Sequence, residues 1–407
     1  MAWISGILNP GFLRRYTMLS KYFIPLSFCM MLANTDTIAQ KNDVSSVEWK
    51  KLATLSNADG SPSLGFAGAI NGVNNNALMV AGGANFPDKM PWEGGKKYYS
   101  DEIHILQKTD GNCSWNKNVT AKLPEPIAYP AVTSTGMGLV YAGGENEKGL
   151  SDKVYLIKWN SSKNKVEIKP LPDLPMAVTN AGLTHIGPVV YLAGGDELKN
   201  SSSRFLSLDL SSQDPEWRIL PDLPVALANA TVLAQKGADG TNIYVIGGRA
   251  KGSSGISDLH NTVFIYNPRT QSWKSGASIA DGGKPMNFSA GTGVAISDRF
   301  LLITGGDNGE VFHQIETYLA KIANAATAEE KANLTAKKNE LVIKHQGFYR
   351  GILLYNTLTS SWSKLGDLPF PAQVTTTAVK WDENIILSNG EVKPGIRTPD
   401  IMIGTVK

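Results

Sequence analysis

The sequence predicts an all-β protein, a six-bladed β-propeller with a short helical insertion in blade five and an N-terminal strand that closes the last blade. Two observations support this fold. Short apolar runs that end in a glycine pair recur along the 407-residue chain, and a second strand-like run follows each of them. The runs are ALMVAGG, LVYAGG, VVYLAGG, IYVIGG and FLLITGG, with first glycines at Gly82, Gly143, Gly194, Gly247 and Gly305. A sixth run, NIILSNG, carries Asn389-Gly390 in place of the pair.

The repeat has a period close to 50 residues. Successive first glycines are separated by 61, 51, 53 and 58 residues. A tryptophan and a Leu-Pro follow the second run, as in EWRILPDLP and SWSKLGDLP. This period, together with the glycine pair and the Tyr…Trp spacing, resembles the kelch repeat, in which each repeat forms one blade. We expect the aromatic side chains to fill the wedge between neighbouring sheets, and the glycines to end a strand where backbones crowd.

The two ends of the chain are expected to share one blade. The sixth repeat supplies three strands, TTAVKW, IILSNG and DIMIGTV, and lacks the fourth strand that should carry a tryptophan. VEWKKLATLS, residues 47–56, is such a strand and has no partner of its own. Joining it to the last blade leaves no open sheet edge. Residues 40–407 therefore read as one propeller domain.

The N-terminal segment has the anatomy of a signal peptide. In LRRYTMLSKYFIPLSFCMMLANTDTIAQ, basic residues precede a short apolar core, and a small-residue site ends at Ala39. The core is too short to span a bilayer. We expect residues 1–39 to be removed and the mature protein to be periplasmic, without a membrane span. Met18 is an alternative start, and a lipoprotein anchored through Cys29 is disfavoured by the bulky Phe28 before it.

Composition excludes several classes of partner and of stabilisation. The formal net charge is +3 and only 18% of residues are charged, so no concentrated basic face is expected and no nucleic-acid partner. After cleavage at Ala39 a single cysteine, Cys113, remains. One thiol cannot form an internal disulfide, so stability must come from a large core.

Two sets of loops should surround one mouth of the ring. In a four-stranded meander blade, the loop after the second strand and the loop before the first strand lie on the same face. The loops after the glycine pairs place Asn85, Phe86, Glu145, Asp196, Arg249, Asp307 and Glu391 at this mouth. Five residues after the proline of successive Leu-Pro pairs come Tyr129, Asn180 and Asn229, and Asn287 falls near the same place. A ring of amides suits a polyhydroxylated ligand, although each Asn alone is equally compatible with a turn.

The fifth repeat contains an insertion. From Gly305 to the sixth repeat is 84 residues, roughly 30 more than elsewhere by the period of the repeat. The excess, at about residues 310–347, is rich in Ala, Lys and Glu, which favours helix. We expect two short helices broken near residues 325–328. A lid over the mouth and a solubilising or dimer-forming excursion are both compatible with the sequence, which leaves the oligomeric state open.

Familiar catalytic motifs are absent from the sequence. The five histidines form no paired ligand spacing such as H-E-x-x-H, and no G-x-S-x-G elbow, P-loop or dinucleotide fingerprint occurs in its proper setting. We therefore expect no metal and no cofactor.

The segment SNGEVKPGIRTPD, residues 388–400, resembles the N-G-E-x-K-P-G-x-R-T-D segment of bacterial N-acetylneuraminate epimerases (sialic acid mutarotases), which are kelch propellers. GFAGAINGVNNNALMVAGGANF, KKYYSDEIHI and AYPAV match as well. In those epimerases the Gly-Phe-Ala-Gly segment follows the N-G-E-x-K-P-G segment, whereas here it precedes it. The chain thus resembles the cyclically permuted branch of that family over about residues 47–407. It departs from the family at Pro399, which is inserted, and at Pro126-Ile127, where the epimerases have Gly-Arg.

The resemblance implies an isomerase that interconverts the α and β anomers of N-acetylneuraminate by acid/base opening of the sugar ring. It assigns proton transfer to Glu391 and the planar cation that holds the sugar carboxylate to Arg397. The Pro394-Gly395 turn would fold Arg397 back towards Glu391. The expected substrate contacts are Lys393, Tyr129, Asn180, Asn229, Asn287, Asn85 and Phe86. The alternative class is a non-catalytic kelch propeller that binds glycan or protein.

Overall fold

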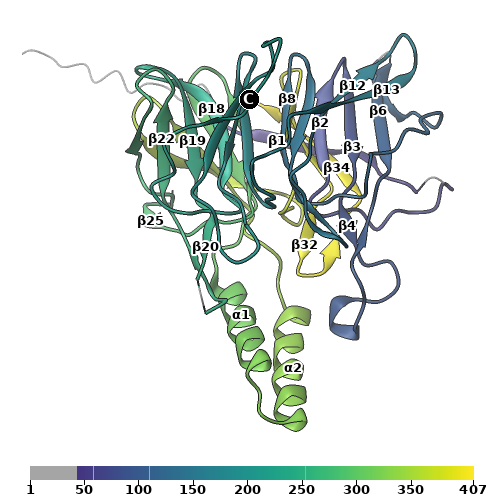
Figure 1. Ribbon diagram of the computed structural model, residues 1–407, viewed down its shortest axis with the longest axis vertical. Coiled ribbons are helices and arrows are strands. Elements are labelled where there is room, and N and C mark those ends of the chain that lie inside the picture. Colours follow the sequence, from purple (N-terminus) through teal and green to yellow (C-terminus); the bar gives the residue numbers. More distant parts are fainter. Residues whose placement is uncertain (1–43, 58, 110, 253) are drawn as a thin grey trace, which may run out of the picture. The chain divides into compact units, whose positions relative to one another are not determined.

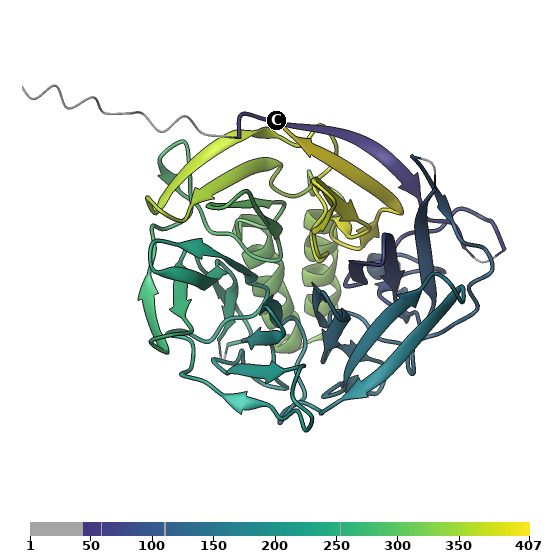
Figure 2. The same cartoon turned by 90° about the horizontal axis from the view of Figure 1, so that it is seen from above.

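The computed structural model describes residues 44–57, 59–109, 111–252 and 254–407. The predicted signal peptide, the alternative start at Met18 and the disfavoured lipid site at Cys29 all lie outside the described residues. The described chain forms six four-stranded antiparallel sheets arranged as blades around a central axis (Figures 1 and 2). The predicted six-bladed propeller is confirmed.

The first three blades follow one another along the chain, each running from the axis outwards. Blade one consists of β2 (Ile70–Asn74), β3 (Ala77–Ala81), β6 (Ile103–Thr109) and β7 (Asn112–Trp115). Blade two consists of β8 (Ala131–Thr135), β9 (Gly138–Ala142), β12 (Val154–Asn160) and β13 (Lys165–Leu171). Blade three consists of β14 (Gly182–Ile186), β15 (Val189–Ala193), β16 (Phe205–Asp209) and β17 (Arg218–Ile219).

The remaining blades repeat this order until the last. Blade four consists of β18 (Thr231–Gly237), β19 (Gly240–Ile246), β22 (Val263–Asn267) and β23 (Ser272–Ser275). Blade five consists of β26 (Thr292–Ile296), β27 (Phe300–Thr304), β28 (Gly351–Asn356) and β29 (Ser361–Asp367). Blade six consists of β30 (Val379–Trp381), β31 (Asn384–Ser388) and β34 (Asp400–Val406), with β1 (Val47–Thr54) as its outer strand.

The outer strand of blade six confirms the predicted closure of the ring. β1 pairs antiparallel with β34, from Val47 opposite Val406 to Thr54 opposite Asp400, with one bulge between Lys51 and Ala53. The first described strand is therefore hydrogen-bonded to the last one. This pairing covers the edge of β34, which would otherwise be open to a strand from another chain.

The hydrophobic core is divided among the six interfaces between blades. Each of the six clusters of buried side chains draws its members from two neighbouring blades. The second strand of a blade is packed on both faces, and every residue of β3, β9 and β27 is buried. This explains why these strands read as continuous apolar runs rather than as alternating patterns.

Tryptophans join blades three, four and five to the blade before each of them. The indole N–H of Trp217 in blade three donates to the carbonyl of Pro172 at 2.9 Å. Trp273 in blade four and Trp362 in blade five donate to Pro221 and Ala277 at 2.9 and 3.0 Å. Because the ring is half-buried while its N–H still finds a partner, each of these tryptophans contributes both apolar area and a directional contact. The predicted wedge-filling role is confirmed.

Short hairpins extend from one face of the disc, which we call the mouth (Figure 1). They are β4 (Ala84–Asn85) with β5 (Tyr98–Tyr99), β10 (Glu145–Asn146) with β11 (Gly149–Leu150), β20 (Arg249–Lys251) with β21 (Ser257–Leu259), and β32 (Glu391–Lys393) with β33 (Ile396–Arg397). The hairpin of β24 (Ala280–Asp281) and β25 (Lys284–Pro285) precedes blade five, and a single 3₁₀ turn spans Pro91–Glu93.

The insertion in blade five forms two helices, α1 (Glu310–Ala323) and α2 (Ala328–Ile343), and the predicted break between them is present. Thr327 caps α2 by accepting the Glu330 N–H at 3.1 Å. The helices project from the mouth face in Figure 1 and lie within the outline of the ring in Figure 2. In the part of the chain that the structure describes, no helix is long and apolar enough to cross a membrane.

Candidate active site

The rim of the mouth is built from six equivalent positions, one in each blade. The residue after each glycine pair forms an isolated bridge with the segment that leads into an inner strand. The glycine pair is needed because a Cβ at Gly194, where φ is +62°, would lie 2.0 Å from the carbonyl oxygen of Leu227. The six rim positions are Ala84, Glu145, Asp196, Arg249, Asp307 and Glu391. Four of the six therefore bring a carboxylate to the mouth.

A second ring of six residues lies just inside the rim. Each residue has φ between +50° and +63°, and each donates its N–H to the carbonyl of the ring residue in the preceding blade at 2.7–3.0 Å. The ring residues are Gly68, Tyr129, Asn180, Asn229, Ala290 and Thr375. The bonds close on themselves, since Gly68 donates to Thr375. The left-handed conformation explains the asparagines, because Asn adopts it more readily than most residues.

The predicted ring of polar side chains is thus present at Tyr129, Asn180 and Asn229, but not at Asn287. The equivalent position in blade five is Ala290, five residues after Pro285, and Asn287 lies three residues earlier with an exposed side chain. Behind the ring, the inner strands enclose an axial cavity of about 390 Å³ that Tyr129, Asn180 and Asn229 also line.

The Glu391–Arg397 pair lies on the hairpin of blade six. The two residues are opposite each other in β32 and β33, and Gly395 in the turn has φ +83°. Glu391 Oε1 accepts the Gly395 N–H at 2.6 Å and Arg397 Nη1 at 3.0 Å. The side chains are only 18% and 5% exposed. The bonds from Glu391 to the described residues all fall on Oε1, which leaves Oε2 available to a ligand.

Phe86 and Ala84 of blade one complete the setting of Arg397. The guanidinium lies over the Phe86 ring, 4.9 Å from its centroid, and Nε donates to the Ala84 carbonyl at 3.3 Å. Because Nη1 is engaged by Glu391, the N–H groups of Nη2 are the ones left for an anion. Phe86 therefore stabilises the guanidinium through a cation–π contact with one face of the group.

Asn85 and Lys393, two further predicted contacts, have different surroundings. The Asn85 side chain is 7% exposed and donates from Nδ2 to the Gly65 carbonyl at 3.0 Å. It fixes a loop rather than facing the mouth, since neighbouring residues of a strand point to opposite faces. Lys393 lies at the end of β32 with a half-buried side chain, close enough to His345 to act on its ionisation.

A second charged group, which the sequence analysis did not assign, faces blade six from blades one and two. Lys97, in the loop between β4 and β5, donates to Glu145 Oε1 at 2.9 Å, and the Tyr99 hydroxyl donates to the same oxygen at 3.0 Å. Lys97 Nζ also lies 5.0 Å from the centroid of the Tyr129 ring. Burial disfavours charged Lys97, but Tyr129 and Glu145 more than offset this and hold its pKa above the ordinary value. Burial raises the pKa of Tyr99 to about 12.

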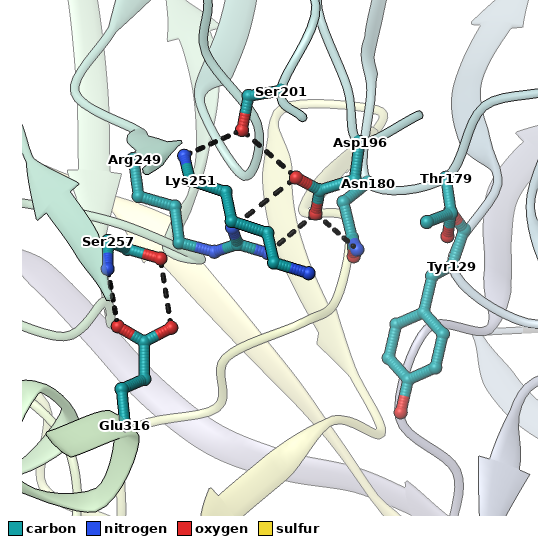
Figure 3. Close-up of polar contacts among 9 residues, drawn as sticks. All are labelled: Tyr129, Thr179, Asn180, Asp196, Ser201, Arg249, Lys251, Ser257 and Glu316. Carbon is teal, nitrogen blue, oxygen red and sulfur yellow. Dashed lines mark hydrogen bonds and ion pairs between the residues drawn. The ribbon is translucent and has the colours of Figure 1, made fainter. Parts of the chain in front are cut away.

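A third charged group joins blades three and four (Figure 3). Arg249 Nη2 lies 2.5 Å from Asp196 Oδ2, and Nη1 lies 3.3 Å from Oδ1. Asn180 Nδ2 and the Ser201 hydroxyl donate to the same carboxylate at 3.3 and 3.0 Å. Every oxygen of Asp196 is therefore occupied by the protein, so this carboxylate is part of the frame of the mouth.

The fourth rim carboxylate, Asp307, opens onto the base of the helical insertion. Its Oδ1 accepts the Gly309 N–H at 2.6 Å, and burial raises the pKa of this carboxyl. Asp307, His345, Tyr318 and Tyr349 line a cavity of about 530 Å³ between the helices and blade five. Burial lowers the pKa of His345, whose Nδ1 accepts the Gly347 N–H at 3.0 Å.

The helices are fixed to the rim at two places. Glu316 of α1 accepts the N–H and the hydroxyl of Ser257 in β21 at 2.7 and 2.9 Å (Figure 3). Asn339 of α2 donates to the Trp92 carbonyl, in the loop of blade one, at 3.2 Å. The insertion thus contacts rim loops of blades four and one as well as its own blade. It lies beside the mouth, as a lid would, and the choice between a lid and a solubilising or dimer-forming excursion stays a prediction.

In the described residues, no group of three or more His, Cys, Asp and Glu side chains is arranged to hold a metal ion. The chemistry available at the mouth is instead that of carboxylates that keep one oxygen without a protein partner, Glu391 among them, with several fixed cations and a phenol. Such a site can hold a small anionic or polyhydroxylated molecule and move protons on it. Fold and site together define a kelch-type propeller with charged side chains around its mouth.

Comparison with known proteins places the chain in a particular family. The family model for N-acetylneuraminate epimerase matches residues 32–166 and 171–407. The chain belongs to the N-acetylneuraminate epimerase family.

Individual relatives match over a shorter span. The chain is 27% identical over 231 residues to the N-acetylneuraminate epimerase of Salmonella typhimurium, covering 56% of each protein. It is 27% identical over 236 residues to that of Haemophilus influenzae and 26% identical over 246 residues to that of Brucella melitensis. The chain thus spans little more than half the length of these relatives, 56%, 57% and 59% respectively. The predicted cyclic permutation stays a prediction.

Proposed function

We propose that this protein is a sugar mutarotase that interconverts the α and β anomers of N-acetylneuraminate. The observation that carries the proposal is the Glu391–Arg397 pair, which presents one free carboxylate oxygen and one free guanidinium nitrogen side by side in a partly enclosed mouth. Family membership supports the same assignment. The relatives with this name are similar over only part of their length, so the substrate itself is part of the proposal.

Arg397 binds the carboxylate of the sugar acid in this proposal. Its guanidinium is held by Phe86, Ala84 and Glu391, so little side-chain entropy is lost when an anion binds. A lysine would keep the charge but not the planar fork that pairs with a carboxylate.

Glu391 transfers the proton of the anomeric hydroxyl. Removing that proton allows the bond between the anomeric carbon and the ring oxygen to break, which gives the open-chain ketone. Returning the proton after the ring closes on the other face of the carbonyl completes the exchange of anomers. The two N–H groups that hold Oε1 fix the carboxylate plane, so Oε2 is presented in one orientation.

Anomer exchange of N-acetylneuraminate, followed by NMR, tests the proposal. The wild-type protein is expected to accelerate exchange, and Glu391→Gln to lose about 10²–10⁴-fold of the rate, the usual contribution of one acid/base group. Glu383→Gln is the matched control, because Glu383 is 96% exposed and remote from the mouth on the β30–β31 turn. Exchange at the spontaneous rate with wild-type protein refutes the proposal. Ligand binding without acceleration would instead favour the non-catalytic glycan-binding propeller.

We further propose that the mature chain is periplasmic, on the basis of the signal-peptide pattern that ends at Ala39. Cell fractionation followed by N-terminal sequencing checks this. A cytoplasmic protein that retains the residues before Ala39 would contradict it.

A further inference from the structure

Tyr129 is the one ionisable residue in the closed backbone ring, and its hydroxyl is unused. Its N–H donates to Gly68 at 2.8 Å and its carbonyl accepts from Asn180 at 3.0 Å, so the backbone is fixed on both sides. The side chain points away from the Asp196–Arg249 pair in Figure 3. Within the described residues the phenolic hydroxyl makes no hydrogen bond. A half-buried hydroxyl that the protein leaves without a partner is suited to a ligand.

The phenol lies next to one charged group of the mouth and within electrostatic reach of another. Lys97 Nζ, held by Glu145, is 5.0 Å from the centroid of its ring. The charges of Arg397 and Glu391 also act on its ionisation. Burial raises the pKa of Tyr129, while Lys97 and Arg397 oppose that rise. The two cations therefore reduce, without cancelling, the penalty that burial places on a phenolate at this position.

None of the other ring residues can donate a proton to a ligand in the mouth. Gly68 and Ala290 have no functional group. Asn180 and Asn229 carry amides, which are far too weak as acids to donate a proton, and the Asn180 amide is also bound to Asp196. The Thr375 hydroxyl donates to the carbonyl of Val374 at 2.7 Å. His345 also lies near Glu391, but its Nδ1 accepts the Gly347 N–H, so the neutral ring keeps its proton on Nε2 and is a very weak acid.

We propose that Tyr129 is the second proton-transfer residue of the site, donating to the ring oxygen of the sugar while Glu391 takes the proton of the anomeric hydroxyl. This inference rests on the proposed mutarotase function. Lys97 is a positioning residue that stabilises the phenolate, and Glu145 with Tyr99 holds Lys97 in place.

The proton balance closes within these two residues. On opening, the bond between the anomeric carbon and the ring oxygen breaks, its electron pair stays on that oxygen, and the phenolic proton of Tyr129 moves to it. The products are the open-chain keto sugar, a tyrosinate and neutral Glu391. On closing, the sugar hydroxyl returns its proton to the tyrosinate and attacks the carbonyl carbon, and the carbonyl oxygen takes the proton from Glu391. Closure on either face restores both residues, as an exchange of anomers requires.

The first test compares Tyr129→Phe with Tyr98→Phe in the full-length protein by NMR anomer exchange. Removing a hydroxyl without a protein partner should leave folding intact. We expect Tyr129→Phe to lower kcat about 100-fold or more, the contribution typical of a general acid, with a smaller change in KM. Tyr98 is the matched control, because it is another tyrosine of the mouth hairpins, in β5, and its side chain is 47% exposed.

A second measurement separates proton donation from a structural role. Replacing Tyr129 by fluorotyrosines of increasing acidity should move the alkaline limb of the pH–rate profile to lower pH in step with the phenol pKa, because the donor must be protonated at the start. Lys97→Met alone should lower kcat. In a protein that already carries Tyr129→Phe, the same substitution should lower kcat little further, because both residues act on the same proton transfer.

The outcomes are distinguishable. This inference is overturned if the rate of Tyr129→Phe is within twofold of the wild-type rate, or if the alkaline limb of the pH–rate profile does not move with fluorination. In either case, a loss of rate in Glu391→Gln would still support the mutarotase function. A wild-type protein that leaves exchange at the spontaneous rate overturns the proposed function itself.

Discussion

Replacing Arg249 by methionine tests whether the Asp196–Arg249 pair is a structural joint between blades three and four. The side chains of Arg249 and Asp196 are 14% and 12% exposed, and two N–H groups of the guanidinium face the carboxylate. Methionine keeps much of the volume but removes the charge. Asp196 would then retain only Asn180 and Ser201 as partners.

The expected loss of unfolding free energy is about 3 kcal/mol, at the lower end of the 3–5 kcal/mol typical when one partner of a buried pair is removed, because two hydrogen bonds to the carboxylate remain. An unfolding entropy of about 2.1 cal/mol/K per residue gives about 0.8 kcal/mol/K for a chain of this size, so Tm should fall by about 4 °C. Lys236→Met is the control. Its pair with Asp298 is 63% and 85% exposed, and such pairs contribute about 0–1 kcal/mol.

Urea unfolding and calorimetry measure the unfolding free energy and Tm of both single variants. The double variant Asp196→Asn/Arg249→Met is measured in the same way. The double variant should recover most of the loss, because no unpaired charge is left in the joint. A loss in Arg249→Met no larger than in Lys236→Met would refute the reasoning. Equal losses in the single and double variants would show that packing of the arginine stem, and not its charge, carries the effect.

Three further outcomes are expected. Asp307→Asn should raise the unfolding free energy at pH 7, because burial raises the pKa of this carboxyl above 3.8 and makes its ionised form costly. In the wild type, a carboxyl whose pKa is raised by folding stabilises the folded state when it is protonated, and this stabilisation is lost as pH rises and the carboxyl ionises. The advantage of Asn over Asp should therefore disappear below pH 3.8, where Asp307 is protonated in both states. Equal shifts of the urea midpoint at pH 7 and at pH 3.5 would contradict this. Glu316→Ala should speed hydrogen exchange in α1 but not in the blades, since the contacts to Ser257 are lost; unchanged exchange would mean that the helices are held elsewhere. Trp362→Phe should cost at least about 0.5–1.5 kcal/mol in urea unfolding, the net value of its bond to Ala277, and the smaller ring adds to this loss; an unchanged unfolding free energy would contradict both contributions.

The fold was predictable because its signals are repeated. Five glycine pairs at a regular period, a fourth strand missing from the last repeat, and VEWKKLATLS without a partner at the other end together require the closure that β1 and β34 make. The two helices of the insertion followed from composition, and their break from the run of small residues between Ala323 and Ala328.

Within the candidate site, the contact between Glu391 and Arg397 was predictable because one local segment carries both residues. Glu391 and Arg397 meet across a Pro-Gly turn, so their pairing is encoded within seven residues. Lys97 was missed because it belongs to a loop with no counterpart in the other repeats, and its partner Glu145 is in the next blade. Asn85 points into the protein because neighbouring residues of its two-residue strand face opposite sides. Asn287 lies three residues before Ala290, the true ring position in blade five, and closeness in the sequence was not enough to identify that position.

The ring of six hydrogen bonds has an electrostatic consequence. Each peptide group in it points to the next around the axis, so the six dipoles circulate and their sum along the axis is close to zero, unlike those of a helix. The scaffold therefore contributes no fixed polarity of its own to a molecule in the mouth. The sign of charge that the mouth accepts is set by the six rim side chains and their neighbours. One blade can change its rim residue without disturbing the ring, so the same backbone can be adapted to acidic, neutral or basic sugars.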